Sequence, residues 1–201
     1  MKTLVCIGDS LIEGEGDELS LGGWVGRVGQ KLAPNLGHQA KGWRYYNLGI
    51  GGDTIRDVHK RLGEVLAREP DVVIVGCGAN DVVGGDTQAM FMLDQYEKTW
   101  AEVLTKLKAL VPHVMVVMGF VARDTSVYAP NWRADYADAF MKHEQNVMAL
   151  CAKMDITLIQ LSTDFGAPEL LSHGVHYNAR GYDALAQMVF EVLEESNWIK
   201  E

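Results

Sequence analysis

Five short apolar runs, separated by stretches with helical periodicity, constrain the fold of this chain more than any other feature. The runs cover residues 3–7, 44–48, 71–77, 113–119 and 157–161. Most are apolar almost throughout, which is typical of strands buried on both faces of a parallel sheet. Between them, apolar residues recur at helical spacing, as in Trp24, Val28 and Leu32. This alternation predicts a parallel sheet with helices on both of its faces.

A serine stands directly after the first of these runs, where Gly8, Asp9 and Ser10 end the apolar stretch. The carboxyl ends of parallel strands meet at one edge of the sheet, and ligands of α/β proteins bind at that edge. A serine hydroxyl held there becomes a nucleophile when a neighbouring base takes its proton. The alternative is that Asp9 or Ser10 only caps the following helix, with Glu13 completing a capping box.

Three further polar blocks follow later strands in the same way, at residues 47–52, 78–81 and 174–178. The first contains Gly51, where a backbone can approach a ligand closely, and the second contains Asn80, whose amide offers two donors. The third contains His176, a candidate general base. Each block alone also fits a structural role: a tight turn, a turn-capping asparagine, or a surface histidine beside Asn178 as a helix cap.

The four blocks in this order resemble those of the GDSL, or SGNH, hydrolase family. The resemblance extends from Gly8 to Tyr182, with Tyr177 where the family usually has a proline. It implies a three-layer α/β/α fold, flavodoxin-like, with a five-stranded parallel sheet in the order 2-1-3-4-5. Residues 1–201 are expected to form a single domain of this kind.

The resemblance also implies a role for each polar block. Ser10 would attack an acyl carbonyl, and His176 would take its proton. The backbone N–H groups of Ser10 and Gly51 and the side-chain amide of Asn80 would hold the oxyanion of the tetrahedral intermediate. The reaction needs no metal and no organic cofactor.

One position departs from the family's pattern. Three residues before the histidine, where an aspartate normally orients the imidazole, this chain has His173. In the serine-protease template, loss of that carboxylate costs on the order of 10⁴ in turnover. Three interpretations are open: a weaker Ser–His dyad, a different acid such as Asp164, or a disabled version of an otherwise intact enzyme. A metal site on His173 and His176 has no convincing third ligand in the sequence.

Candidate substrate contacts come from the loops that follow the strands. They are Asp9, Leu11, Met90, Phe91, Trp132 and Val175. Short connections and apolar side chains favour an open site for carboxylic esters or thioesters with short to medium acyl chains. The alternatives are a carbohydrate O-acetyl esterase, or a binding protein on the same fold that has lost catalysis.

Composition narrows the list of partners. The formal net charge of −9 argues against binding to nucleic acid and to anionic membrane surfaces. The three cysteines, Cys6, Cys77 and Cys151, lie in apolar surroundings and favour buried thiols over disulfides. The first strand begins almost at Met1, so we expect no signal peptide within the chain and a cytoplasmic protein. A leader sequence removed before Met1 is the alternative. The sequence does not indicate an oligomeric state.

Overall fold

The computed structural model describes residues 2–33, 42–83, 93–118, 134–161, 165, 167–172 and 176–199. Within these residues, parallel strands form one five-stranded sheet in the order β2-β1-β3-β4-β5, which confirms the predicted order. The strands are β1 (Lys2–Gly8), β2 (Trp43–Gly49), β3 (Val72–Gly76), β4 (His113–Met118) and β5 (Thr157–Gln160). Gly8 of β1 is level with Gly49 of β2 and with Gly76 of β3. The residues that follow these three strands therefore emerge together at one edge of the sheet.

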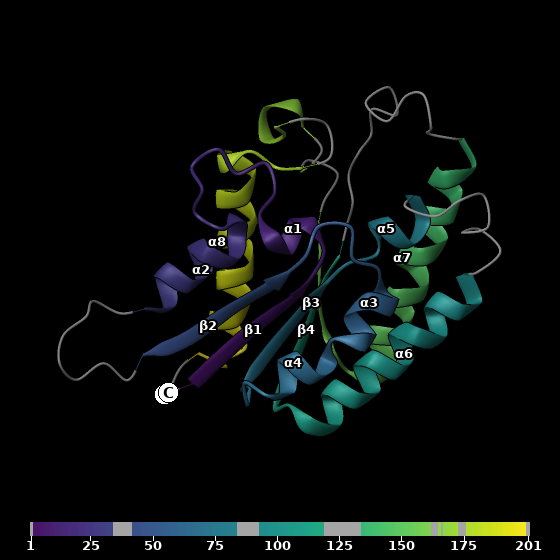
Figure 1. Ribbon diagram of the computed structural model, residues 1–201, viewed down its shortest axis with the longest axis horizontal. Helices are drawn as coiled ribbons and strands as arrows, with labels where there is room; N and C mark the ends of the chain where they lie inside the picture. The colour runs from purple at the N-terminus through teal and green to yellow at the C-terminus, as the bar shows by residue number, and fades with distance from the viewer. Residues whose placement is uncertain are drawn as a thin grey trace.

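Helices connect the strands and cover both faces of the sheet (Figure 1). They are α1 (Ser10–Glu13), α2 (Gly23–Leu32), α3 (Ile55–Lys60), α4 (Leu62–Leu66), α5 (Ala79–Val83), α6 (Leu93–Leu110), α7 (Ala134–Met154), the 3₁₀ turn η4 (Pro168–Leu170) and α8 (Ala179–Glu195). Residues 55–66 form two helices, α3 and α4, that are separated at Arg61. There the backbone departs from helical geometry, and the Arg61 guanidinium donates to the carbonyl of Leu48 at the end of β2.

Alternate residues of the central strands enter two separate cores. On β1, Leu4 and Cys6 pack in the core covered by α2 and α8, whereas Val5 and Ile7 pack in the core covered by α3, α4, α6 and α7. Figure 1 shows α2 and α8 on one side of the sheet and α6 and α7 on the other. This arrangement follows from the period of two along a strand and gives the three-layer architecture predicted from the sequence.

Local sequence signals fix the ends of two helices next to the sheet edge. Thr54 caps α3 in a reciprocal capping box with Asp57, and the Asn178 side chain accepts a hydrogen bond from Gly181 N–H at the start of α8. The Asn178 cap was predicted. Cys6, Cys77 and Cys151 are buried and unpaired, as expected. In the described part of the chain, no helix has the length and apolar character needed to span a membrane.

Candidate active site

The turn after β1 places Ser10 at the carboxyl edge of the sheet with its side chain turned outward. A Cβ on Gly8 would lie 1.7 Å from the carbonyl oxygen of Gly76, so β1 can end this close to β3 only with a glycine. Asp9 is the N-cap of α1, and its Oδ1 accepts from Leu11 N–H at 3.0 Å. Burial raises the pKa of Asp9 to about 7. The capping alternative is therefore correct for Asp9 and wrong for Ser10, which is the first residue of the helix.

His176 reaches Ser10 from the far end of the chain. Its Nε2 lies 2.9 Å from Ser10 Oγ, and its side chain is 14% exposed. The loop that carries it is closed by backbone hydrogen bonds from Ser172 N–H to His176 O and from Asn178 N–H to Leu170 O, both at 2.9 Å. An imidazole nitrogen at this distance from a serine hydroxyl is in position to take its proton.

The two other predicted oxyanion donors, Gly51 N–H next to Ser10 and the side-chain amide of Asn80, already have partners. Gly51 N–H donates to Glu13 Oε2 at 2.7 Å, and a Cβ on Gly51 would lie 3.9 Å from Ser10 Cβ. Asn80 Nδ2 donates to the carbonyl of Asp53 at 3.1 Å, which holds the Asn80 side chain against the turn that contains Gly51. A substrate oxygen that uses Gly51 N–H therefore has to displace the carboxylate of Glu13.

Asp81 braces these two segments against each other. It is fully buried, and its two carboxylate oxygens accept from Ile55 N–H at 3.2 and 3.1 Å, at the first turn of α3. Burial raises the pKa of Asp81 to about 7. Asp81 thus connects the segment with Asn80 to the segment after Gly51.

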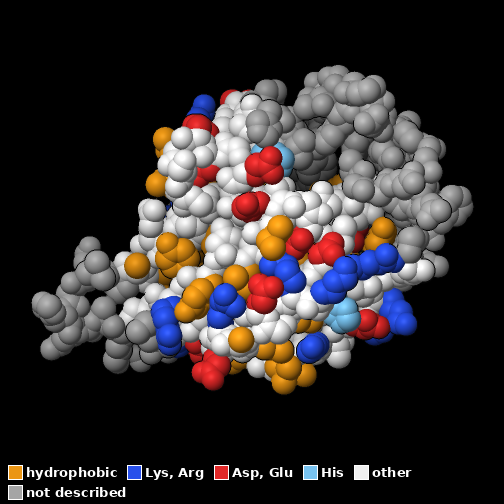
Figure 2. Space-filling model, viewed as in Figure 1, with side chains coloured by type: hydrophobic (Ala, Val, Ile, Leu, Met, Phe, Trp, Pro, Cys, Tyr) orange, Lys and Arg blue, Asp and Glu red, His pale blue; other side chains and the backbone are white. Residues whose placement is uncertain are grey.

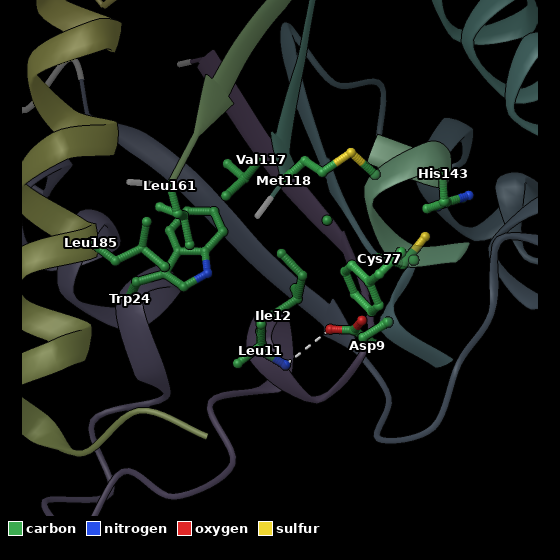
Figure 3. A pocket seen from close by; sticks show the side chains of 14 residues that line it. Asp9, Leu11, Ile12, Trp24, Cys77, Val117, Met118, His143, Leu161 and Leu185 are labelled. Carbon is green, nitrogen blue, oxygen red and sulfur yellow. Dashed lines mark hydrogen bonds between the residues drawn. The ribbon is translucent and has the colours of Figure 1, made fainter. Parts of the chain in front are cut away.

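A mainly apolar cavity of about 40 Å³ lies at this edge of the sheet, between α1, the ends of β3 and β4, and helices α2, α7 and α8 (Figure 3). Asp9 and Leu11, the two neighbours of Ser10 in sequence, both line it. His143 of α7 stands in its wall, and burial lowers the pKa of this histidine to about 4, so His143 is neutral at physiological pH. The cavity has space for a group of a few atoms.

Glu13 and Glu15 are site residues that the sequence analysis did not identify. Glu13 was assigned to a capping box, whereas its side chain reaches Gly51. Glu15 Oε2 lies 3.4 Å from His176 Nε2. The available signal was the pattern of Gly14 and Gly16 around Glu15, because both glycines have positive φ and reverse the chain directly above the serine.

Several predicted site residues lie outside the described residues. These are His173, Val175, Met90, Phe91, Trp132 and the alternative acid Asp164. The described residues bring Ser10 into contact with His176 and place Gly51 next to Ser10, while Asn80 is held at the turn after Gly51 and Asp9 and Leu11 line the cavity. Among the described residues, no group of three His, Cys, Asp or Glu side chains is placed to hold a metal ion.

The family model of the GDSL-like lipase/acylhydrolase family matches residues 6–184 of this sequence. The chain belongs to this family.

An acetylxylan esterase from Geobacillus stearothermophilus is 36% identical over 137 residues, which are 59% of this chain and 60% of that protein. The aligned segment thus spans less than two thirds of the relative. In the solved structure of a catalytic mutant of Axe2, an acetylxylan esterase from the same organism, the fold is similar with a TM-score of 0.73 at 24% identity, covering 94% and 93% of the two chains. The α/β hydrolase LAE5, from the metagenome of Lake Arreo, gives a TM-score of 0.74 at 19% identity, covering 94% of each chain. These two structural likenesses concern the fold.

Proposed function

We propose that this chain is a serine esterase that forms an acyl-enzyme on Ser10 and releases short acyl groups from neutral carboxylic esters. The observation that carries the proposal is the 2.9 Å contact between Ser10 Oγ and His176 Nε2, made by residues 166 positions apart. Membership of a family of lipases and acylhydrolases supports the reaction class.

In the proposed reaction, Ser10 Oγ attacks the acyl carbonyl while its proton passes to His176 Nε2. The Ser10 and Gly51 N–H groups and Asn80 Nδ2 hold the oxyanion, once Glu13 has left Gly51. The imidazolium then gives its proton to the departing alkoxide, so the alcohol leaves and the acyl group stays on Ser10. A water molecule, deprotonated by His176, releases the carboxylic acid in the second half of the cycle.

The acyl group of the proposed substrate is short. The cavity beside Asp9 and Leu11 encloses only about 40 Å³, which suits an acetyl or similarly small group better than a long chain. Exposed carboxylates of Glu13 and Glu15 flank Ser10 and disfavour anionic esters such as acyl groups carried on phosphate-containing thiols.

A second candidate is a carbohydrate O-acetyl esterase, and the similarity to an acetylxylan esterase favours it. It differs from the first in the alcohol that leaves, not in the chemistry at Ser10. Comparison of acetylated xylo-oligosaccharides with simple alkyl acetates decides between them: a kcat/KM much higher on the acetylated sugars establishes the carbohydrate esterase.

The test of the proposed function is hydrolysis of p-nitrophenyl acetate and butyrate by the wild-type chain, by Ser10→Ala and by His173→Asp. Activity in the wild type that Ser10→Ala lacks establishes Ser10 as the nucleophile. Covalent labelling by a fluorophosphonate probe, present in the wild type and absent in Ser10→Ala, gives the same answer without a chosen substrate. Activity that appears only in His173→Asp assigns the chain to a disabled enzyme. If neither the wild type nor His173→Asp shows activity or labelling, the result would favour a binding protein.

A further inference from the structure

We propose that Glu15 is a positioning residue that stabilises the protonated form of His176. The carboxylate of Glu15 supplies this stabilisation as a negative charge next to Nε2, the imidazole nitrogen that faces Ser10. The inference rests on the proposed function, in which His176 is the base. Among the described residues, Glu15 is the acid within ion-pair distance of the imidazole, with 3.4 Å between Glu15 Oε2 and His176 Nε2. Figure 2 shows acidic side chains next to a histidine at this end of the molecule.

The backbone around Glu15 is fixed by contacts on both sides. Glu15 N–H donates to the carbonyl of Ser10 at 3.0 Å, and the buried Tyr182 hydroxyl donates to the carbonyl of Glu15 at 2.7 Å. Gly16 packs directly against the loop of His176: a Cβ on Gly16 would lie 2.8 Å from the carbonyl of Tyr177 and 2.9 Å from His176 Cβ. The position of Glu15 beside the imidazole is therefore built into the fold.

Three other acids among the described residues of this region have partners of their own. Glu13 accepts from Gly51 N–H, and Glu18 accepts from Ala179 N–H at the start of α8, at 2.9 Å. Asp9 lies beneath α1, where it caps the helix. Among the described residues, Glu15 is thus the carboxylate within ion-pair distance of Nε2, and half of its side chain is exposed to solvent.

The contact is selective for the transition state. When His176 is neutral with its proton on Nδ1, Nε2 presents a lone pair to Ser10, and a neighbouring anion adds no attraction there. Once the proton has passed to Nε2, the imidazolium is attracted to Glu15. An interaction that exists mainly after proton transfer lowers the barrier rather than strengthening the ground state. At this separation in a water-like dielectric, one charge shifts the pKa of another group by roughly one pH unit.

The experiment is a titration of the His176 imidazole by NMR in the wild type, in Glu15→Gln and in Glu195→Gln. Glu195 lies at the other end of α8, about 24 Å along the helix, and serves as the control for removal of one exposed carboxylate. We expect Glu15→Gln to lower the pKa of His176 by roughly one pH unit, and Glu195→Gln to leave it in place. An unchanged pKa in Glu15→Gln would overturn the proposal.

The pH profile of kcat/KM provides a second readout. Glu15→Gln should move the acid limb to lower pH by about the same amount and lower the plateau by about tenfold, and Glu15→Asp should restore the limb toward the wild type. A lower plateau with an unmoved limb would mean a merely structural role. If Glu15→Gln does not fold, the pKa of His176 in the wild type can be measured at increasing salt concentrations. Because salt screens the Glu15 charge, this pKa should fall as salt is added. The NMR titration does not depend on activity, so failure of this inference is distinguishable from failure of the proposed esterase function.

Discussion

Replacement of Glu13 with alanine is expected to raise the esterase activity of this chain. Glu13 Oε2 accepts a hydrogen bond of 2.7 Å from Gly51 N–H, and Gly51 N–H is one of the three proposed oxyanion donors. In the wild type, the substrate oxygen has to break this hydrogen bond before it can use the donor. The side chain of Glu13 is exposed, so its removal should leave the fold intact.

Two contributions set the size of the effect. A hydrogen bond to a charged group contributes about 1.5–3 kcal/mol when protected, and solvent exposure reduces this to about 1 kcal/mol. A carboxylate about 4 Å from the developing oxyanion adds a repulsion of about 1 kcal/mol in a water-like dielectric. Together the two contributions amount to about 2 kcal/mol, and because each ~1.4 kcal/mol corresponds to a factor of ten in rate, we expect kcat/KM to rise by about thirtyfold.

The assay is steady-state hydrolysis of p-nitrophenyl acetate by the wild type, Glu13→Ala and Glu13→Gln. Glutamine removes the charge but keeps an acceptor for Gly51 N–H, so it should lie between the other two in kcat/KM. Glu195→Gln controls for the loss of one surface charge. A folded Glu13→Ala variant whose kcat/KM is equal to or below that of the wild type would refute the idea that Glu13 obstructs the donor.

Three further predictions concern the framework of the site. Gly16→Ala should lower both stability and kcat/KM, because φ at Gly16 is +88° and the new Cβ would lie 2.8 Å from the carbonyl of Tyr177; wild-type kinetics in this variant would contradict the packing described above. Burial raises the pKa of Asp81 from 3.8 to about 7, so the folded protein keeps a proton that the unfolded chain releases, and the free energy of unfolding falls as pH rises through that interval. Asp81→Asn should make this decline less steep by up to ~1.4 kcal/mol per pH unit. If urea unfolding shows the same dependence of the free energy of unfolding on pH in the wild type and in Asp81→Asn, this role of Asp81 is excluded. Arg27→Ala should lower the free energy of unfolding, measured with urea, by about 3 kcal/mol, because it leaves the buried carboxylate of Asp17 without its 2.6 Å ion pair. A loss near zero would show that the backbone N–H groups suffice to hold Asp17.

The sheet could be predicted from the sequence because its signals are local. Runs of apolar residues mark the strands, and the structure places strand ends within two residues of the predicted positions. Caps such as Thr54 and Asn178 were also readable, since each depends on residues within three positions along the chain. The sheet order, by contrast, came largely from the family resemblance, because local patterns do not say which strands pair.

The site could be predicted only in part. The meeting of Ser10 with His176 is a long-range contact, and it was expected from the resemblance rather than from any spacing. Gly14 and Gly16 signal a chain reversal, but the sequence does not show where Glu13 and Glu15 come to lie, because that depends on how the chain runs between α1 and α2. That reversal is set by Asp17, whose carboxylate accepts from Gly23 N–H at 3.0 Å and from Arg27 at 2.6 Å, and by the positive φ at Gly14 and Gly16.

Glu13 and Glu15 carry the same charge but are expected to act in opposite directions. The transition state of acyl transfer is positive at the imidazole and negative at the carbonyl oxygen, and the turn after α1 places one carboxylate near each end. Glu15 favours the imidazolium, whereas Glu13 competes for an oxyanion donor. Loss of both charges in a double variant should therefore leave the plateau of kcat/KM within about threefold of the wild-type value, because the two effects partly cancel, although the acid limb still moves to lower pH. A rate measured at one pH would miss both effects, and only the combination of pH profiles with the single variants separates a carboxylate that assists the base from one that obstructs the oxyanion.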